Sequence, residues 1–333
     1  MLCLQQTLNL RLFAAIVNLW LCLSLLVESF STTFSSRPTV ATYFLVDKAS
    51  KQLLGSCYQL EPLLLETAED EVDEYYPTSR KAYVFDQPKP TTKNNASSNA
   101  ANQTANNSSN KREISVRRTS FGCSKLGYTV WPASLVLSLD MVARTGDYEG
   151  KRILELGAGV GLPSVVAGKV VGASAILATD HWLNDDAEAF DDKRLIPTPY
   201  HEMNLRFNVQ SENSSIRNVD WHDIESVRAA CTDFSPDVVI GSDLIYYPSD
   251  LPFLCRTLEH FLLDPSSSCR EILLVSPLPE PIREALPQFQ EWLEQKALDK
   301  MFQLDTNTLV LHENKIEEAE GGEHFLKVTM KRQ

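Results

Sequence analysis

The sequence lacks the cysteine and histidine patterns of disulfide-rich and metal-binding proteins. Seven cysteines occur in 333 residues, and no two of them form a Cys-x-x-Cys pair. Cys3 and Cys22 lie in a segment that we expect to be removed, and the five that remain are scattered and odd in number. The six histidines are dispersed as well. These absences argue against a disulfide framework, and we predict no metal site.

The sequence also lacks an excess of positive charge. It has 31 Lys and Arg against 44 Asp and Glu, a formal net charge of −13. Nucleic-acid binding normally needs a basic surface that neutralises phosphates, so we expect no nucleic-acid partner. The acidic balance is explained by solubility or, alternatively, by a basic protein or peptide partner.

One apolar run near the N-terminus has the length of a signal peptide. Arg11 precedes this run, which extends from Leu12 to Val27 and is short for a membrane span. A Ser/Thr-rich stretch with few acidic residues follows, a composition that resembles a transit peptide placed behind a signal peptide. We therefore predict a targeting segment at residues 1–29, a plastid destination and no stable membrane insertion after processing. The alternatives are a cytoplasmic protein and one anchored by an uncleaved helix.

The rest of the chain divides into three parts by composition. Residues 30–86 read as an N-terminal extension with short strands, and residues 87–111 as a disordered Asn/Ser-rich insertion with little to bury. In residues 112–333, strand patterns alternate with helix patterns, and the apolar run of residues 236–247 predicts one such strand. This alternation predicts an α/β fold with a doubly wound, mostly parallel sheet and an antiparallel C-terminal hairpin. We expect a monomer.

Three glycines, Gly157, Gly159 and Gly161, directly follow a buried-strand pattern. Their spacing is G-x-G-x-G, whereas the dinucleotide fingerprint is G-x-G-x-x-G and would need glycine at Leu162. The loop after the first strand of an open α/β sheet is the default ligand site.

Two carboxylates flank this loop in the sequence. Glu155 precedes the first glycine by two positions, where it would repel a pyrophosphate but suit a cofactor that carries an ammonium and a sulfonium. Asp180, at the end of the next strand, can accept two hydrogen bonds from ribose hydroxyls. The pattern is typical of S-adenosylmethionine-dependent methyltransferases of the seven-strand class. Tight packing without a ligand and a nicotinamide or flavin cofactor are the alternatives.

Four separated motifs between Ile114 and Arg332 resemble the family 16 protein-lysine methyltransferases. They are GYTVWPASLVLSL (127–139), ILELGAGVGLPS (153–164), VDWHD (219–223) and VVIGSDLIYY (238–247). The resemblance implies a Rossmann-like class I methyltransferase with a seven-stranded sheet in residues 112–333. It also implies S-adenosylmethionine as cofactor and a lysine side chain of a protein as substrate.

The resemblance further implies which residues meet the cofactor. The expected cofactor-binding residues are Trp131, Glu155, Gly157, Ala158, Gly159, Gly161, Asp180, Asp220, Trp221 and Ser242. Trp131 would flank the cofactor, and Trp221 would pack by its adenine. Ser242 would touch the cofactor at a position where the family more often has alanine. Alternatively, both tryptophans are plain core residues, Asp180 is a helix cap and Asp220 is a solvated aspartate.

Asp243 and Tyr246 are the expected catalytic residues, because they match the family's Asp-x-x-Tyr element. The Asp243 carboxylate would orient the substrate amine or hold the loop, and Tyr246 would offer its ring face and hydroxyl to the ammonium that forms. Capping of the following turn is the alternative for Asp243, and Tyr247 is a second candidate for the channel wall. The segment 181–199 is longer and more acidic than the family's usual connection. A small-molecule methyltransferase and an inactive binding module with the same fold are the alternative functions.

Overall fold

The computed structural model describes residues 39–60, 78–86, 111–119, 127, 129–181, 200–209, 211–278, 284–315 and 322–333. Residues Val40–Gln333 form one compact unit. The predicted targeting segment, residues 1–29, lies outside the described residues. The same holds for the predicted Asn/Ser-rich insertion apart from Lys111, and for residues 182–199 of the acidic segment.

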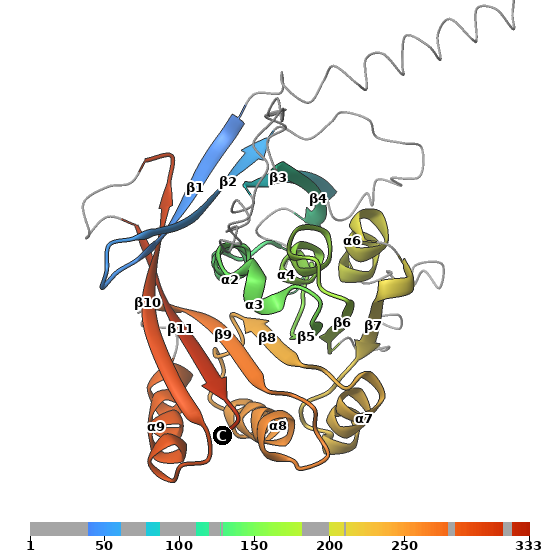
Figure 1. The fold of residues 1–333 in the computed structure, drawn as a ribbon, viewed down its shortest axis with the longest axis vertical. Coiled ribbons are helices and arrows are strands. Elements are labelled where there is room, and N and C mark those ends of the chain that lie inside the picture. The colour runs from blue at the N-terminus through green and yellow to red at the C-terminus, as the bar shows by residue number, and fades with distance from the viewer. Residues whose placement is uncertain are drawn as a thin grey trace, which may run out of the picture. The chain divides into compact units, whose positions relative to one another are not determined.

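The described residues contain one 11-stranded sheet (Figure 1). Its strands are β1 (Thr39–Asp47), β2 (Leu53–Leu60), β3 (Thr78–Asp86), β4 (Lys111–Thr119), β5 (Arg152–Leu156), β6 (Ala175–Asp180), β7 (Ser214–Asn218), β8 (Val238–Ser242), β9 (Glu271–Leu278), β10 (Gln303–Glu313) and β11 (Glu323–Lys331). They lie in the order β4-β3-β2-β1-β10-β11-β9-β8-β5-β6-β7.

Seven of these strands, from β7 to β10 in the sheet order, form the predicted doubly wound sheet. The strands β7, β6, β5, β8 and β9 are parallel to one another, and β11 inserts antiparallel between β9 and β10. All five residues of β8 are buried, as expected for a parallel strand that is covered on both faces. The strand order confirms the predicted Rossmann-like class I fold with an antiparallel C-terminal hairpin.

The N-terminal strands continue this sheet beyond β10. β1 pairs antiparallel with β10, with Tyr43 opposite Glu313. β2, β3 and β4 follow, and β3 is antiparallel to both of its neighbours. Strands β1 to β4 are therefore part of the same sheet as the parallel strands β5 to β9, and β4 is the edge strand of the described sheet.

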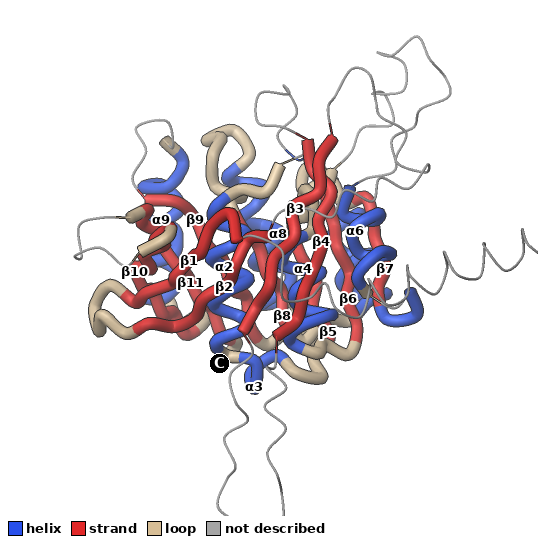
Figure 2. Tube along the Cα trace, turned by 90° about the horizontal axis from the view of Figure 1, so that it is seen from above, coloured by secondary structure: helices blue, strands red, loops and turns tan. Residues whose placement is uncertain are grey.

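Helices cover both faces of the sheet (Figure 2). They are α2 (Pro132–Ala143), α3 (Thr145–Tyr148), α4 (Leu162–Val166) with the π-helical turn η3 (Ala167–Val171), α6 (Tyr200–Asn208), the 3₁₀ turn η4 (Ser211–Asn213), α7 (Ile224–Phe234), α8 (Leu251–Leu263) and α9 (Ala285–Leu298). One core joins α7, α8 and α9 to one face of the parallel strands. The other joins α2 and α4 to the opposite face and to the N-terminal strands.

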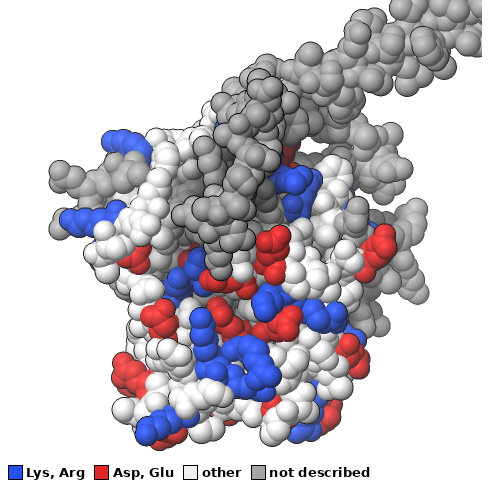
Figure 3. All heavy atoms as spheres, in the orientation of Figure 1, with Lys and Arg blue, Asp and Glu red and all other residues white. Residues whose placement is uncertain are grey.

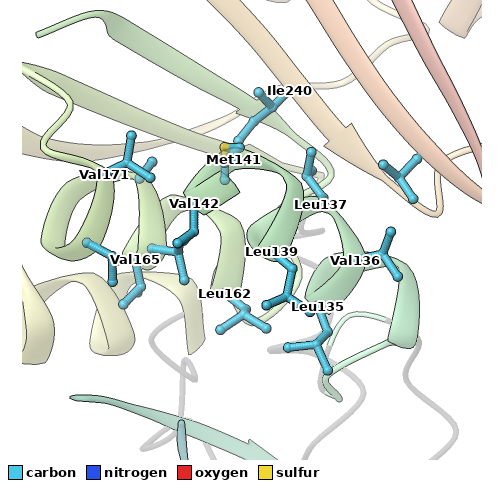
Figure 4. Packing of buried hydrophobic residues seen from close by; sticks show 14 of the residues in the cluster. Leu135, Val136, Leu137, Leu139, Met141, Val142, Leu162, Val165, Val171 and Ile240 are labelled. Atoms are coloured by element: carbon cyan, nitrogen blue, oxygen red, sulfur yellow. The ribbon is translucent and has the colours of Figure 1, made fainter. Parts of the chain in front are cut away.

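Helix α2 is buried on all sides. Every residue from Ala133 to Val142 is buried, and Figure 4 shows its apolar side chains among those of α4 and β8. A helix that is apolar all round needs cover on every face, and the N-terminal strands supply it on the side away from the parallel strands (Figure 1). Its one carboxylate, Asp140, accepts a hydrogen bond from Lys327 Nζ at 3.1 Å and another from the Arg144 guanidinium.

Charges of both signs are interspersed on the face of the molecule shown in Figure 3. No helix among the described residues is long and apolar enough to cross a membrane. The described part of the chain also holds no group of three or more His, Cys, Asp or Glu side chains that could bind a metal ion. Its four described cysteines, Cys57, Cys231, Cys255 and Cys269, are buried thiols.

Candidate functional site

The carboxyl ends of the parallel strands β5, β6, β7 and β8 meet at one edge of the sheet. The ends of these strands and the loops that follow them carry all of the predicted site residues except Trp131. In open α/β sheets, ligands bind outside these strand ends. We call the loop between β5 and α4, residues 157–161, the glycine loop.

The glycine loop needs its glycines for conformation and for space. Its φ angles are +59° at Gly157, +55° at Gly159 and +75° at Gly161. A Cβ atom on Gly157 would lie 2.6 Å from Leu244 Cδ2, and one on Gly161 would lie 2.8 Å from His201 Cβ. A side chain at either position would therefore combine a strained backbone with an overlap.

Asp180 fixes the middle of the glycine loop. Its Oδ2 accepts a hydrogen bond from the Gly159 N–H at 2.6 Å, and its Oδ1 accepts one from the His181 N–H at 2.8 Å. Burial raises the pKa of the Asp180 carboxyl, while nearby His201 and these two N–H groups act in the opposite direction. Each carboxylate oxygen has a further lone pair, so Asp180 can still accept hydrogen bonds from a ligand.

Glu155 lies behind the glycine loop. It has no exposed surface, and its Oε2 accepts hydrogen bonds from both the N–H (3.0 Å) and the hydroxyl (2.5 Å) of Ser164 in α4. Its Oε1 is buried without a hydrogen-bond partner among the described residues. Burial raises the pKa of Glu155 to about 8 although the Ser164 hydrogen bonds oppose this. In this structure Glu155 ties β5 to α4.

The loop after β7 brings Trp221 to the glycine loop. The Trp221 ring atom Cζ2 lies 3.6 Å from the position that a Cβ on Gly157 would take. Neighbouring Asp220 accepts hydrogen bonds from the His222 N–H at 2.8 Å and from His222 Nδ1 at 3.1 Å. Burial raises the pKa of Asp220, but the His222 hydrogen bonds, together with the charges of His181 and His222, lower that pKa overall.

The loop after β8 begins with an unusual backbone turn. The strand pattern predicted for residues 236–247 ends at Ser242, which is buried. Asp243 adopts a left-handed φ of +60°, and its N–H donates to the Val275 carbonyl at 2.9 Å. This turn ends the strand, and Leu244 then packs into the core against the glycine loop.

Tyr246 lies close enough to Asp180 for the charge of that carboxylate to act on its hydroxyl. Burial, together with the negative charges of Asp180 and Asp250, raises the pKa of Tyr246 to about 12. Its ring meets the Tyr247 ring edge to face, with centroids 4.7 Å apart. The Tyr247 side chain is 53% exposed, so Tyr246 is the inner and Tyr247 the outer ring of the pair.

The segment before α2 runs past the glycine loop. A Cβ on Gly127 would lie 3.7 Å from Gly159 Cα and 3.8 Å from Asp180 Oδ2. Trp131 ends this segment as the N-cap residue of α2, and its carbonyl accepts hydrogen bonds from the N–H and the hydroxyl of Ser134.

Two residues that the sequence analysis did not single out contact the glycine loop. His201 Nδ1 lies 3.1 Å from the Gly159 carbonyl oxygen, and Asn204 Nδ2 donates to the Val160 carbonyl at 2.8 Å. Both belong to α6, which lies beyond the acidic segment. Neither belongs to a known motif, so only their place on the helix after Asp180 could have pointed to them.

The profile of a family described as lysine methyltransferase matches residues 109–276, about half of the chain. The chain belongs to this family. The match confirms the resemblance inferred from the four motifs. It extends from just before β4 into β9 and so includes every predicted site residue.

Individual relatives of this chain are distant. It is 28% identical over 135 residues to a protein N-lysine methyltransferase METTL21A of Danio rerio, over 39% of this chain and 53% of the relative. It is 30% identical over 142 residues to a histone-arginine methyltransferase METTL23 of Xenopus laevis, over 41% of this chain and 52% of the relative. The chain spans about half the length of these curated relatives. The crystal structure of a putative RNA methyltransferase from Pyrococcus horikoshii is 16% identical and covers 65% of this chain and 92% of its own, with a TM-score of 0.39.

Membership of a methyltransferase family bears out the expected cofactor, S-adenosylmethionine. The residues at the strand ends fit this group. The glycines of the loop have no side chain between their backbone and a ligand. Asp180 offers acceptors for a pair of hydroxyls, and the Trp221 ring lies beside Gly157.

Proposed function

We propose that this protein transfers a methyl group from S-adenosylmethionine to the side-chain amine of a lysine in another protein. The observation that carries the proposal is the loop after β8. Leu244 of this loop packs on the glycine loop, and Tyr246, two residues later, is close enough to Asp180 for the charge of Asp180 to act on its hydroxyl. The groups expected at the methyl donor and at the methyl acceptor are thus fixed to each other. The METTL21A relative supports lysine as the acceptor.

The chain's own residues would hold the cofactor at the strand ends. Asp180 would accept hydrogen bonds from the ribose hydroxyls, the bare backbone of Gly157 to Gly159 would lie along the cofactor, and Trp221 would pack beside it. When bound, the cofactor supplies a methyl group on a positively charged sulfur. The protein's task is then mainly alignment and exclusion of water.

The acceptor lysine must reach the site as a neutral amine, although the pKa of a free lysine is about 10.4. A partly desolvated position lowers the pKa of an amine. The Tyr246 hydroxyl keeps its proton at neutral pH because its pKa is raised to about 12, so it acts as a hydrogen-bonding group and not as a base. Its ring face can stabilise the ammonium product by roughly 0.5–2 kcal/mol. Asp243, held by the hydrogen bond to Val275, would orient the amine.

The test is methyl transfer from labelled S-adenosylmethionine to proteins of a cell extract, followed by acid hydrolysis and separation of the methylated amino acids. We expect label in methyllysine. Label in methylarginine would instead identify arginine as the acceptor, the side chain in the name of the METTL23 relative. Label only in small molecules or nucleic acid would overturn the proposal.

Two matched variants assign the role of the loop after β8. Tyr246→Phe removes the inner hydroxyl, and Tyr247→Phe removes the outer, exposed one. We expect the first to lower kcat on the order of tenfold with unchanged cofactor affinity, and the second to change neither by more than about twofold. Asp243→Ala should abolish protein methylation, and calorimetry should still detect cofactor binding. An equal effect of the two tyrosine variants would contradict the assignment of Tyr246.

A further inference from the structure

Helix α6 holds two successive carbonyl groups of the glycine loop. His201 Nδ1 lies 3.1 Å from the Gly159 oxygen, and Asn204 Nδ2 lies 2.8 Å from the Val160 oxygen. Because a carbonyl oxygen only accepts, Nδ1 of His201 carries the proton in this contact. The Cβ of His201 also occupies the space beside Gly161.

The Gly159 peptide groups are therefore held from two sides. Asp180 accepts from the Gly159 N–H at 2.6 Å, and His201 donates to the Gly159 carbonyl. The carboxylate that is expected to bind the ribose and the histidine on α6 thus meet at a single residue of the loop. A displacement of His201 would move the carbonyl of Gly159 and, with it, the N–H that orients Asp180.

Asn204 at the same time pairs with the edge strand β4. Its Oδ1 accepts from the Arg117 N–H at 2.7 Å, and its Nδ2 donates to the Arg117 carbonyl at 3.0 Å. This two-way exchange copies the pairing between antiparallel strands. Asn204 is 1% exposed, and both hydrogens of its amide and its oxygen have partners. The carboxamide has one orientation only, so it links β4 rigidly to the glycine loop.

Asn208, one helical turn later, provides an internal comparison. It makes the same two-way exchange with Ser115 of β4, at 3.0 Å and 2.7 Å. Its second amide hydrogen goes to the Asn204 carbonyl at 2.8 Å and not to the glycine loop. Asn204 and Asn208 therefore share the structural task of covering the sheet edge. They differ in their other contacts, because Asn204 donates to the Val160 carbonyl, whereas Asn208 Oδ1 also accepts from Lys169 Nζ at 3.4 Å.

We propose that Asn204 and His201 are positioning residues for cofactor binding, which set the glycine loop from α6. In this arrangement the edge of the N-terminal part of the sheet is connected to the cofactor site through one carboxamide. The inference rests on the strand-end site being the cofactor site. It does not depend on which substrate receives the methyl group.

The first test compares Asn204→Ala with Asn208→Ala in the full chain. Calorimetry measures the Kd for S-adenosylmethionine, and thermal unfolding measures stability. Each variant loses the exchange with β4, so we expect similar decreases in Tm. Only Asn204→Ala should weaken cofactor binding, on the order of tenfold, against less than about twofold for Asn208→Ala. Equal changes in Kd for the two variants would overturn the proposal.

A second pair tests the same proposal if Asn204→Ala does not fold. His201→Asn keeps the Cβ and places an amide N–H donor near the position of Nδ1, whereas His201→Leu keeps the Cβ and offers no donor. We expect His201→Leu to raise the Kd on the order of tenfold and His201→Asn to restore most of the affinity. Equal Kd values for the two variants would overturn the role of His201.

The outcome is separable from that of the proposed function. A wild-type protein that binds S-adenosylmethionine but methylates no protein contradicts the proposed substrate, and the comparison of Kd values still decides the role of α6. A wild-type protein that binds no S-adenosylmethionine overturns both.

Discussion

Glu155 should make the stability of this protein fall as the pH rises. Its side chain is fully buried, and burial raises its pKa from 4.5 to about 8. Between these two values the folded state holds a proton that the unfolded state has released. The free energy of unfolding then decreases by about 1.4 kcal/mol per pH unit. The stabilisation that comes from protonated Glu155 is complete below pH 4.5 and lost above pH 8. Over this window of about 3.5 pH units, the free energy of unfolding changes by at most about 5 kcal/mol.

The matched variant is Glu155→Gln, which keeps the shape and an acceptor for the Ser164 N–H but cannot ionise. Urea unfolding of both proteins at constant ionic strength, between pH 5 and pH 9, gives the two free-energy curves. We expect the wild-type curve to fall relative to that of the variant up to about pH 8 and to run parallel beyond it. Parallel curves over the whole range would refute the reasoning. Ser164→Ala removes the hydroxyl hydrogen bond, one of the two that hold this pKa down, and leaves the one from the backbone N–H, so it should move the upper end of the window to higher pH.

Three further predictions concern other contacts. Gly157→Ala places a Cβ 2.6 Å from Leu244 Cδ2 at a φ of +59°, so it should lower stability by about 1–3 kcal/mol in thermal unfolding and weaken cofactor binding; an unchanged Tm would contradict this. Lys327→Met leaves buried Asp140 without one of its partners and should lower the free energy of unfolding in urea by roughly 3 kcal/mol. The control Lys331→Met removes a half-exposed lysine paired with Glu271 and should lower it by less than about 1 kcal/mol. Similar losses for the two variants would contradict the role of the buried pair. In a spectroscopic titration, Tyr246→Phe should remove a phenol that ionises near pH 12, and a loss of signal near pH 10 would argue against its burial.

The strands and loops around the candidate cofactor site could be predicted where a short sequence pattern specifies them. The buried-strand pattern and the glycine spacing that follows it together placed β5 and the glycine loop. The end of β8 was not predictable from hydrophobicity, because Leu244 and Ile245 are apolar and buried but lie in a loop. What ends the strand is the backbone turn at Asp243, and apolar periodicity does not register such a turn.

The long-range part of the architecture could not be predicted from one sequence. The strand pattern at β1 was clear, but nothing in it specifies β10 as its partner. The contacts of α6 were missed for a related reason. Asparagine is most often a turn or cap residue, and only the approach of β4 turns Asn204 and Asn208 into partners of a sheet edge. The burial of Glu155 also needed the structure, because a carboxylate two residues before a glycine loop suggests a ligand before it suggests Ser164.

The pairing of β1 with β10 has a consequence for synthesis of the protein. Tyr43 and its partner Glu313 are 270 positions apart, so β1 leaves the ribosome long before β10 exists. At roughly 5–20 residues per second, the delay is on the order of 15–50 s. During that time the apolar side of β1 and the cover of α2 are incomplete. Such a nascent chain exposes apolar surface of the kind that chaperones bind, and β1 completes its pairing only after β10 has been made.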